Sequence, residues 1–292
     1  LALRQKHPAW GASKIKHRLL RLDPQRTDVP ALSTIGQILK RNGMIEPQKS
    51  VKHRAFQRFE HAEPNQLWQM DFKGDFLLGN QRRCYPLGVS DDHSRFLLGL
   101  RACTNMQSQT VKAELTKIFR QYGLPERMLM DNGAPWGQDA DHRHTVLTAW
   151  LMHLGIAISH GRPYHPQTQG KQERIHRTMD EELLSRTTLG NHRRAQAAFD
   201  QWRDVYNTER PHQALQMQVP ADRYRHSQRA FPEMLPPIEY PSTMLVRRVQ
   251  QKGRISVNGR CVKVGRPFVG YPVGLLPGQV DGVWIVHFCQ SV

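Results

Sequence analysis

The segment LWQMDFKGDFLL (67–78) combines the pattern of a β-strand with a carboxylate at the centre of that strand. GNQRR (79–83) follows as a turn and CYPLGVSDD (84–92) as a second strand, so the stretch predicts a β-hairpin. Asp71 lies in the middle of the first strand. A charged residue there is costly unless it is paired or coordinates a cation.

The chain alternates between strand and helix patterns beyond this hairpin. A third strand comes first, and helix, strand, helix and strand follow it, which predicts an α/β core with a mixed sheet covered by helices. The expected elements are strands at 94–103, 126–131 and 156–161 and helices at 110–123, 144–155, 167–186 and 191–209.

Residues 1–45 predict two short helices with basic polar faces, which suits a helix-turn-helix. Ser33 is expected as the N-cap of the second helix and Gly43 as the residue that ends it. A basic two-helix bundle without groove specificity is the alternative. Because the pattern is already helical at Leu1, we expect a truncated N-terminus.

The flanks of the core predict further units. The expected order is a helix-turn-helix region at 1–45, a basic linker at 46–65, a catalytic core with trailing helices at 66–225, a Pro-rich linker at 226–246 and a small β-barrel at 247–292.

The net charge of +17 favours a polyanion partner, either nucleic acid or an anionic membrane surface. The charge is concentrated in the flanks, with +9 in residues 1–60, +1 in 61–190 and +7 in 191–292. No apolar run is long enough to span a membrane. The four cysteines form no Cys-x-x-Cys pair, so neither zinc nor a disulfide scaffold is expected. The candidate DNA-binding residues are Lys14, Lys16, Ser33, Thr34, Lys40, Arg41, Arg162, Tyr164, His165, Lys171, Arg174 and Arg177.

Two further carboxylates are candidates for the same site as Asp71. Asp131 ends the strand RMLM (127–130), and Glu173 lies in the opening turns of a helix among basic residues. Taken singly, Asp131 could be a turn residue and Glu173 could stabilise its helix end. Together, three carboxylates form an all-oxygen site suited to Mg²⁺ or Mn²⁺, and two such ions can catalyse phosphoryl displacement.

These acids lie in WQMDF, MLMDNG and GRPYHPQTQGKQERIHRTM, which resemble the DDE triad of integrase-core insertion-sequence transposases. That family is related to retroviral integrases and has a ribonuclease-H-like fold. DDHSRFLLG (91–99) and YNTERPHQAL (206–215) are also similar to the family's sequences. The resemblance implies that Asp71, Asp131 and Glu173 are the catalytic and metal-binding residues.

The resemblance further implies a Mg²⁺-dependent transposase that cleaves element ends and joins them to target DNA as a homo-oligomer. Such an enzyme would work in the bacterial cytoplasm, at the nucleoid. A catalytically silent DNA-binding protein from a decayed element and a nuclease of the same fold are the alternatives. Asp91 and Asp92 are expected to cap a turn. Asp75 is expected on the same strand face as Asp71 but ranks below the triad.

Overall fold

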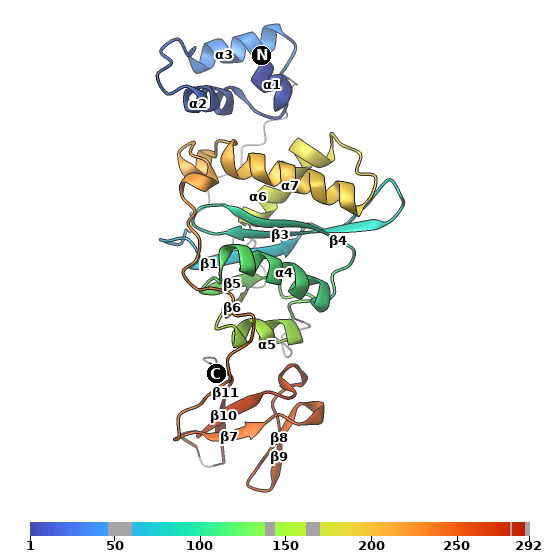
Figure 1. The fold of residues 1–292 in the computed structure, drawn as a ribbon, viewed down its shortest axis with the longest axis vertical. Helices are drawn as coiled ribbons and strands as arrows, with labels where there is room; N and C mark the ends of the chain where they lie inside the picture. The colour runs from blue at the N-terminus through green and yellow to red at the C-terminus, as the bar shows by residue number, and fades with distance from the viewer. Residues whose placement is uncertain (46–59, 138–143, 162–169, 281, 290–292) are drawn as a thin grey trace.

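The computed structural model describes residues 1–292 except 46–59, 138–143, 162–169, 281 and 290–292. Three parts follow one another along the long axis of the molecule (Figure 1). A group of helices lies at one end, a sheet with helices on both faces lies in the centre, and a small β unit lies at the other end.

The N-terminal part consists of α1 (Ala2–Lys6), α2 (Ala12–Leu22) and α3 (Leu32–Arg41). Helices α2 and α3 are amphipathic, so their apolar faces pack together and their basic faces point away from this small core. The core that they share with the connecting segment is formed by Trp10, Ile15, Ile35 and Leu39.

The start of α3 differs from the prediction. The helix begins at Leu32 with Ala31 as its N-cap, and the Ile35 N–H donates to the Ala31 carbonyl. Ser33 is therefore inside the first turn, and the prediction that it caps the helix is wrong. Gly43 is confirmed as the residue that ends the helix, since its φ of +66° is favourable for glycine.

The central sheet has the order β2-β3-β1-β5-β6, and β4 pairs with β3. The pairs of β3 with β1, β2 and β4 are antiparallel, whereas β1–β5 and β5–β6 are parallel. This is the mixed sheet that the sequence predicts. The strands are β1 (Leu67–Phe72), β2 (Phe76–Leu77), β3 (Arg83–Asp91), β4 (Leu97–Cys103), β5 (Arg127–Met130) and β6 (Ala157–His160).

Helices cover both faces of this sheet (Figure 1). On one face, α4 (Ser108–Tyr122) and α5 (Val146–His153) bury side chains such as Trp68 and Met70 of β1. On the other face, α6 (Gly170–Met179), which continues into a π-helical turn at Asp180–Leu184, packs with α7 (His192–Thr208). Since side chains alternate along a strand, the neighbours of Trp68 and Met70 on β1 point to the opposite face, which α6 covers.

Asp75 does not share a strand with Asp71, contrary to the prediction. Strand β1 ends at Phe72, and Gly74 has a φ of +98°, which extended strands do not adopt. The side chain of Asp75 pairs with Arg83 at the start of β3 instead.

The C-terminal unit is present as two small sheets around one core. The three-stranded sheet has the order β11-β10-β7, and β8 pairs with β9. The predicted small β domain is thus observed, but its described strands form two separate sheets rather than one closed barrel. The strands are β7 (Leu245–Arg248), β8 (Arg254–Val257), β9 (Arg260–Lys263), β10 (Pro272–Pro277) and β11 (Trp284–His287). Two 3-10 turns of the described residues belong to this unit, Gln251–Gly253 and Arg266–Phe268. Two others, Gln213–Leu215 and Pro220–Asp222, follow α7 in the central part.

The basic face of α2 docks on the central part through ion pairs. Arg21 makes a two-pronged pair with Asp222, at 2.7 and 2.8 Å, and Arg18 lies 3.0 Å from Glu209. Val205 of α7 adds an apolar contact to the N-terminal core. Partly exposed pairs of this kind are individually weak and are screened by salt.

This docking predicts a salt-sensitive proximity that cross-linking can measure. The Ser13 hydroxyl lies 3.9 Å from the Met217 sulfur. A Ser13→Cys/Met217→Cys variant should therefore react readily with a short bifunctional thiol reagent at low salt. About 1 M NaCl, or the added change Arg21→Ala, should reduce the yield several-fold. The exposed Cys261 is first replaced by serine. Equal yields at all salt concentrations would contradict ionic docking.

Candidate active site

Asp71 is placed by the alternation of β1. Trp68 and Met70 enter the core beneath α4 and α5, so Gln69 and Asp71 project toward the face that α6 covers. Asp71 pairs with Gly88 of β3, which carries no side chain to crowd it. The carboxylate is partly buried on a helix-covered face of the sheet.

Asp131 lies beside Asp71 because of the parallel register. Leu67 pairs with Arg127 and Gln69 with Leu129, and two more residues along each strand lead to Asp71 and Asp131. Neighbouring strands are about 4.8 Å apart, and residues at equal register positions point to the same face. The two acids, separated by 60 residues in the chain, thus occupy adjacent positions.

The loop after Asp131 is held by hydrogen bonds to β6 and its end. The ring of His160 bonds the Asp131 carbonyl at 2.9 Å, and the Asn132 amide donates to the Gly161 carbonyl at 2.8 Å. The Asn132 side chain therefore positions the end of β5. The carboxylate of Asp131 remains exposed.

Glu173 reaches the same face from the opening turn of α6. Its neighbour Gln172 is buried and donates to the Gln69 carbonyl at 2.8 Å and to the Ser90 hydroxyl at 3.0 Å. These bonds attach the helix start to β1 and β3. Glu173 itself is exposed in the first turn.

The electrostatics indicate that the three acids interact. The pKa of Asp71 is raised to about 6, first by burial, then by the neighbouring Asp131 carboxylate and also by Glu173, against a backbone hydrogen bond that lowers it. Such a rise means that negative charge is poorly compensated at this position. Protonation or a cation would relieve the repulsion.

The carboxylates do not meet at a single point. Among the residues that the structure describes, no three His, Cys, Asp or Glu side chains converge closely enough to hold one ion. Coulombic repulsion acts over a longer range than metal coordination. The acids can therefore raise the pKa of Asp71 without converging closely enough to share an ion. Asp71 and Asp131 occupy adjacent register positions, and Glu173 is exposed in the first turn of α6. The convergence of all three carboxylates on shared metal ions stays a prediction.

The donor set nevertheless fits a hard divalent cation. All three candidate ligands are carboxylates, which Mg²⁺ and Mn²⁺ prefer over softer metals. The raised pKa of Asp71 points the same way, because a cation would stabilise the ionised form that burial and Asp131 destabilise.

The predicted DNA-binding residues fall into groups. Arg162, Tyr164 and His165 lie outside the described residues. Arg174 and Arg177 are exposed on α6 beside Glu173. The residues predicted on α3 are all exposed; they are Ser33, Thr34, Lys40 and Arg41.

Two of the predicted lysine contacts need correction. The ammonium of Lys171 pairs with the buried carboxylate of Asp92, which turns it inward, away from a ligand on the surface. Lys14 on α2 faces Glu182 at 4.0 Å, and burial, followed by nearby Arg210, lowers its pKa to about 8. Lys16 on the same helix is partly exposed and remains a candidate.

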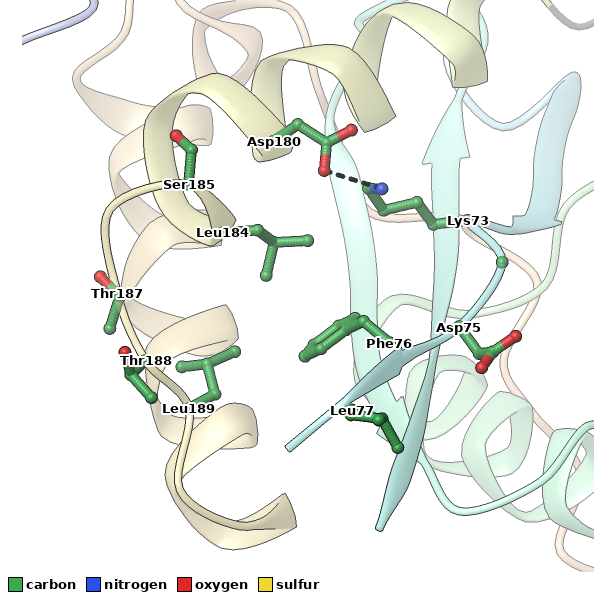
Figure 2. Close-up of a pocket in the computed structure, with 11 residues that line it drawn as sticks. Lys73, Asp75, Phe76, Leu77, Asp180, Leu184, Ser185, Thr187, Thr188 and Leu189 are labelled. Atoms are coloured by element: carbon green, nitrogen blue, oxygen red, sulfur yellow. Dashed lines mark ion pairs between the residues drawn. The ribbon is translucent and has the colours of Figure 1, made fainter. Parts of the chain in front are cut away.

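A surface cavity of about 480 Å³ lies between the segment that follows β1 and the segment that follows α6 (Figure 2). The ion pair between Lys73 and Asp180, 2.8 Å long, closes one side of it. None of the three candidate acids lines the cavity, so it is distinct from the carboxylate face. Its lining residues are Lys73, Gly74, Asp75, Phe76, Leu77, Asp180, Leu184, Ser185, Thr187, Thr188 and Leu189.

Comparison with known protein families agrees with this architecture. Residues 61–166 match the integrase core domain, and residues 154–220 match a second description of an integrase core domain. The central part of the chain is therefore an integrase core, with the ribonuclease-H-like fold that the sequence predicts. Residues 244–291 match the C-terminal domain of IS481 family transposases, so the chain combines an integrase core with a transposase C-terminal domain.

Curated relatives come from insertion elements and retroviruses. An uncharacterized 31.7 kDa protein of insertion element IS407 from Burkholderia multivorans is 27% identical over 162 residues, which cover 54% of this chain and 55% of that protein. The Gag-Pro-Pol polyprotein of Mason-Pfizer monkey virus is 33% identical over 116 residues, which cover 39% of this chain and 6% of the polyprotein. The chain spans about half the length of the insertion-element relatives it matches.

Solved structures with similar coordinates are integrases. The catalytic core domain of HTLV-2 integrase in complex with magnesium matches with a TM-score of 0.43 and 13% identity, over 56% of this chain and 99% of that one. A simian T-cell lymphotropic virus intasome matches with a TM-score of 0.45 and 12% identity, over 94% of this chain and 97% of that one. The fold assignment rests on the core domain match and the strand order. No described helix is both long and apolar enough to cross a membrane.

Proposed function

We propose that this protein is a DNA transposase, a divalent-metal-dependent polynucleotidyl transferase that cleaves element ends and joins them to target DNA. The observation that carries the proposal is the register of β1 and β5, which sets Asp71 beside Asp131 within an integrase core. Glu173, in the first turn of α6, is the third acid of the proposal, and its effect on the pKa of Asp71 supports this choice. The insertion-element relatives and the transposase C-terminal domain support action on bacterial DNA at the nucleoid.

In this proposal Asp71, Asp131 and Glu173 hold Mg²⁺ or Mn²⁺, two ions in all. Bound there, the ions would supply charge neutralisation at the phosphate and activation of the attacking hydroxyl. The chain's own residues bind and orient the DNA. Arg174 and Arg177, exposed on the helix that carries Glu173, are positioned to contact backbone phosphates next to the acids.

We also propose that the protein works as a homo-oligomer on paired DNA ends. The similar integrase structures are described as dimeric, trimeric or part of an intasome, which supports this assembly. Within each copy, the exposed residues of α3 would read or clamp DNA, since α2 is docked on the core.

The proposed activity is tested with labelled duplexes, taken from the DNA flanking the coding sequence, and a supercoiled target plasmid. With Mg²⁺ or Mn²⁺, the protein should join the labelled 3′ ends to the plasmid, and chelation should abolish joining. Nicks without joining would identify a nuclease of the same fold. DNA binding without any nick or joined product would identify a catalytically silent DNA-binding protein and refute the transposase.

The two faces of the N-terminal helices should differ in their effect on DNA binding. Replacing Lys40 and Arg41 of α3 with alanine should weaken affinity about tenfold at moderate salt and reduce the slope of log K against log salt by about 2. Lys14→Ala is the matched control and should change affinity less than about twofold, because Lys14 faces Glu182. Fluorescence anisotropy across salt concentrations measures the DNA affinity of each variant. Equal losses of affinity in the α3 variant and in Lys14→Ala would exclude α3 as the contact face.

A further inference from the structure

A buried carboxylate behind the candidate site connects three separate segments. Asp92 follows β3 and is 1% exposed. Its oxygens accept hydrogen bonds from the Gln69 amide at 2.6 Å and from the His61 backbone N–H at 3.0 Å. The carboxylate also pairs with the ammonium of Lys171 from α6, with the His61 ring at 3.2 Å and with the Arg95 guanidinium at 4.0 Å. A single side chain thereby joins β1, the segment before β1 and the start of the helix that carries Glu173.

The contacts of Asp92 lie close in sequence to two of the proposed metal ligands. Gln69 precedes Asp71 by two residues on β1, and Lys171 precedes Glu173 by two residues on α6. The bonds from Gln172 to β1 and β3 make a second attachment of the same turn. The opening turn of α6 is thus fixed at two adjacent residues, immediately before Glu173.

The adjacent Asp91 provides a natural comparison. It is equally buried, at 1% exposure, but its oxygens accept from the backbone N–H and hydroxyl of Ser94 and from the Asn65 backbone N–H. These partners lie in the turn that follows β3 and in the segment that precedes β1. Asp91 therefore stabilises the local turn, whereas Asp92 reaches across to α6.

We propose that Asp92 is a positioning residue for catalysis: through Lys171 it fixes the opening turn of α6 and so orients Glu173 toward Asp71. The inference rests on the proposed function of Glu173 as a metal ligand. Desolvation offsets much of the Coulombic attraction of a buried ion pair, so we assign this pair a role in geometry rather than in stability. A ligand misplaced by about 1 Å can cost roughly 10²-fold in rate.

The test compares Asp92→Asn with Asp91→Asn in the full chain, below the melting temperature of each variant. Asp92→Asn should reduce strand-transfer kcat by about 10- to 100-fold. It should raise the Mn²⁺ concentration for half-maximal rate several-fold and leave the DNA KM within about twofold. Asp91→Asn should keep the wild-type metal dependence, even if it lowers the melting temperature as much. Asp92→Glu should recover part of the rate.

Amide hydrogen exchange keeps the inference independent of the proposed activity, and a double variant tests the pairing of Asp92 with Lys171. Amide hydrogen exchange should accelerate at residues 171–175 in Asp92→Asn and around Ser94 in Asp91→Asn. Lys171→Met and the double variant Asp92→Asn/Lys171→Met should have rates close to that of Asp92→Asn, because the pair acts as a unit.

Unchanged exchange in α6, or an unchanged Mn²⁺ requirement in Asp92→Asn, would overturn the positioning role. A wild-type protein that joins no DNA, while its α6 exchange responds to Asp92→Asn, would refute the transposase and keep the anchoring of the helix.

Discussion

Asp71→Asn, Asp131→Asn and Glu173→Gln should each reduce end cleavage and strand transfer by about 10³-fold or more. Each change removes one charged ligand, and a bound metal supplies several kcal/mol of transition-state stabilisation. The fold should survive, because the substitutions preserve size and Asp131 and Glu173 are exposed. Joining assays with labelled ends measure the activity, and anisotropy should give DNA affinities within about twofold of the wild type.

Asp75→Asn is the matched control for these three variants. Asp75 is an acid close to Asp71 in sequence, but it lies beyond the end of β1 and pairs with Arg83. It should retain joining activity within about threefold. A triad variant with near-normal activity, or an inactive Asp75→Asn, would refute the assignment of the site.

Asp71→Asn should also stabilise the protein above pH 6. The folded-state pKa of Asp71 is raised to about 6 from an ordinary value of 3.8, mainly by burial and then by Asp131. Ionisation of Asp71 is therefore unfavourable in the fold. Its protonated form contributes stability fully below about pH 4, and this contribution is lost as the pH rises through about 6.

At pH 7.5 the asparagine variant should be more stable by about 1 kcal/mol, a value reduced from the full shift because the site is partly exposed. The melting temperature should rise by about 2–4 °C, and the difference should vanish below about pH 4. Mg²⁺ should stabilise the wild type and reduce the difference in melting temperature between it and Asp71→Asn. Thermal melts from pH 4 to 8, with and without MgCl₂, measure this, and a constant difference across pH would contradict the electrostatic cause.

The sequence was sufficient to predict the sheet and the order of the three acids. Strand and helix patterns place Asp71 inside β1 and Asp131 directly after β5, but the sequence did not predict that these two strands are neighbours. The structure supplies their parallel pairing. The predicted extension of the strand to Asp75 failed because one glycine, Gly74, turns the backbone away.

The ion pairs could not be predicted, because they join residues far apart in the chain. Lys171 and Asp92 are 79 residues apart, and nothing in either local sequence indicates that they meet. A basic residue close to the candidate glutamate suggested DNA contact, whereas tertiary packing directs Lys171 into the protein. The adjacent acids Asp91 and Asp92 at the end of β3 were the available sign of such an ion pair, since a buried charge requires a partner.

The docking of α2 also changes the electrostatic field that the N-terminal segment presents to an approaching polyanion. Glu209 and Asp222 neutralise arginines that a count from the sequence assigns to the N-terminal segment. The far field of residues 1–45 is consequently weaker than their composition implies. Long-range capture of DNA should then depend more heavily on the opposite end of the molecule, where exposed Arg254, Arg260 and Lys263 project from β8 and β9.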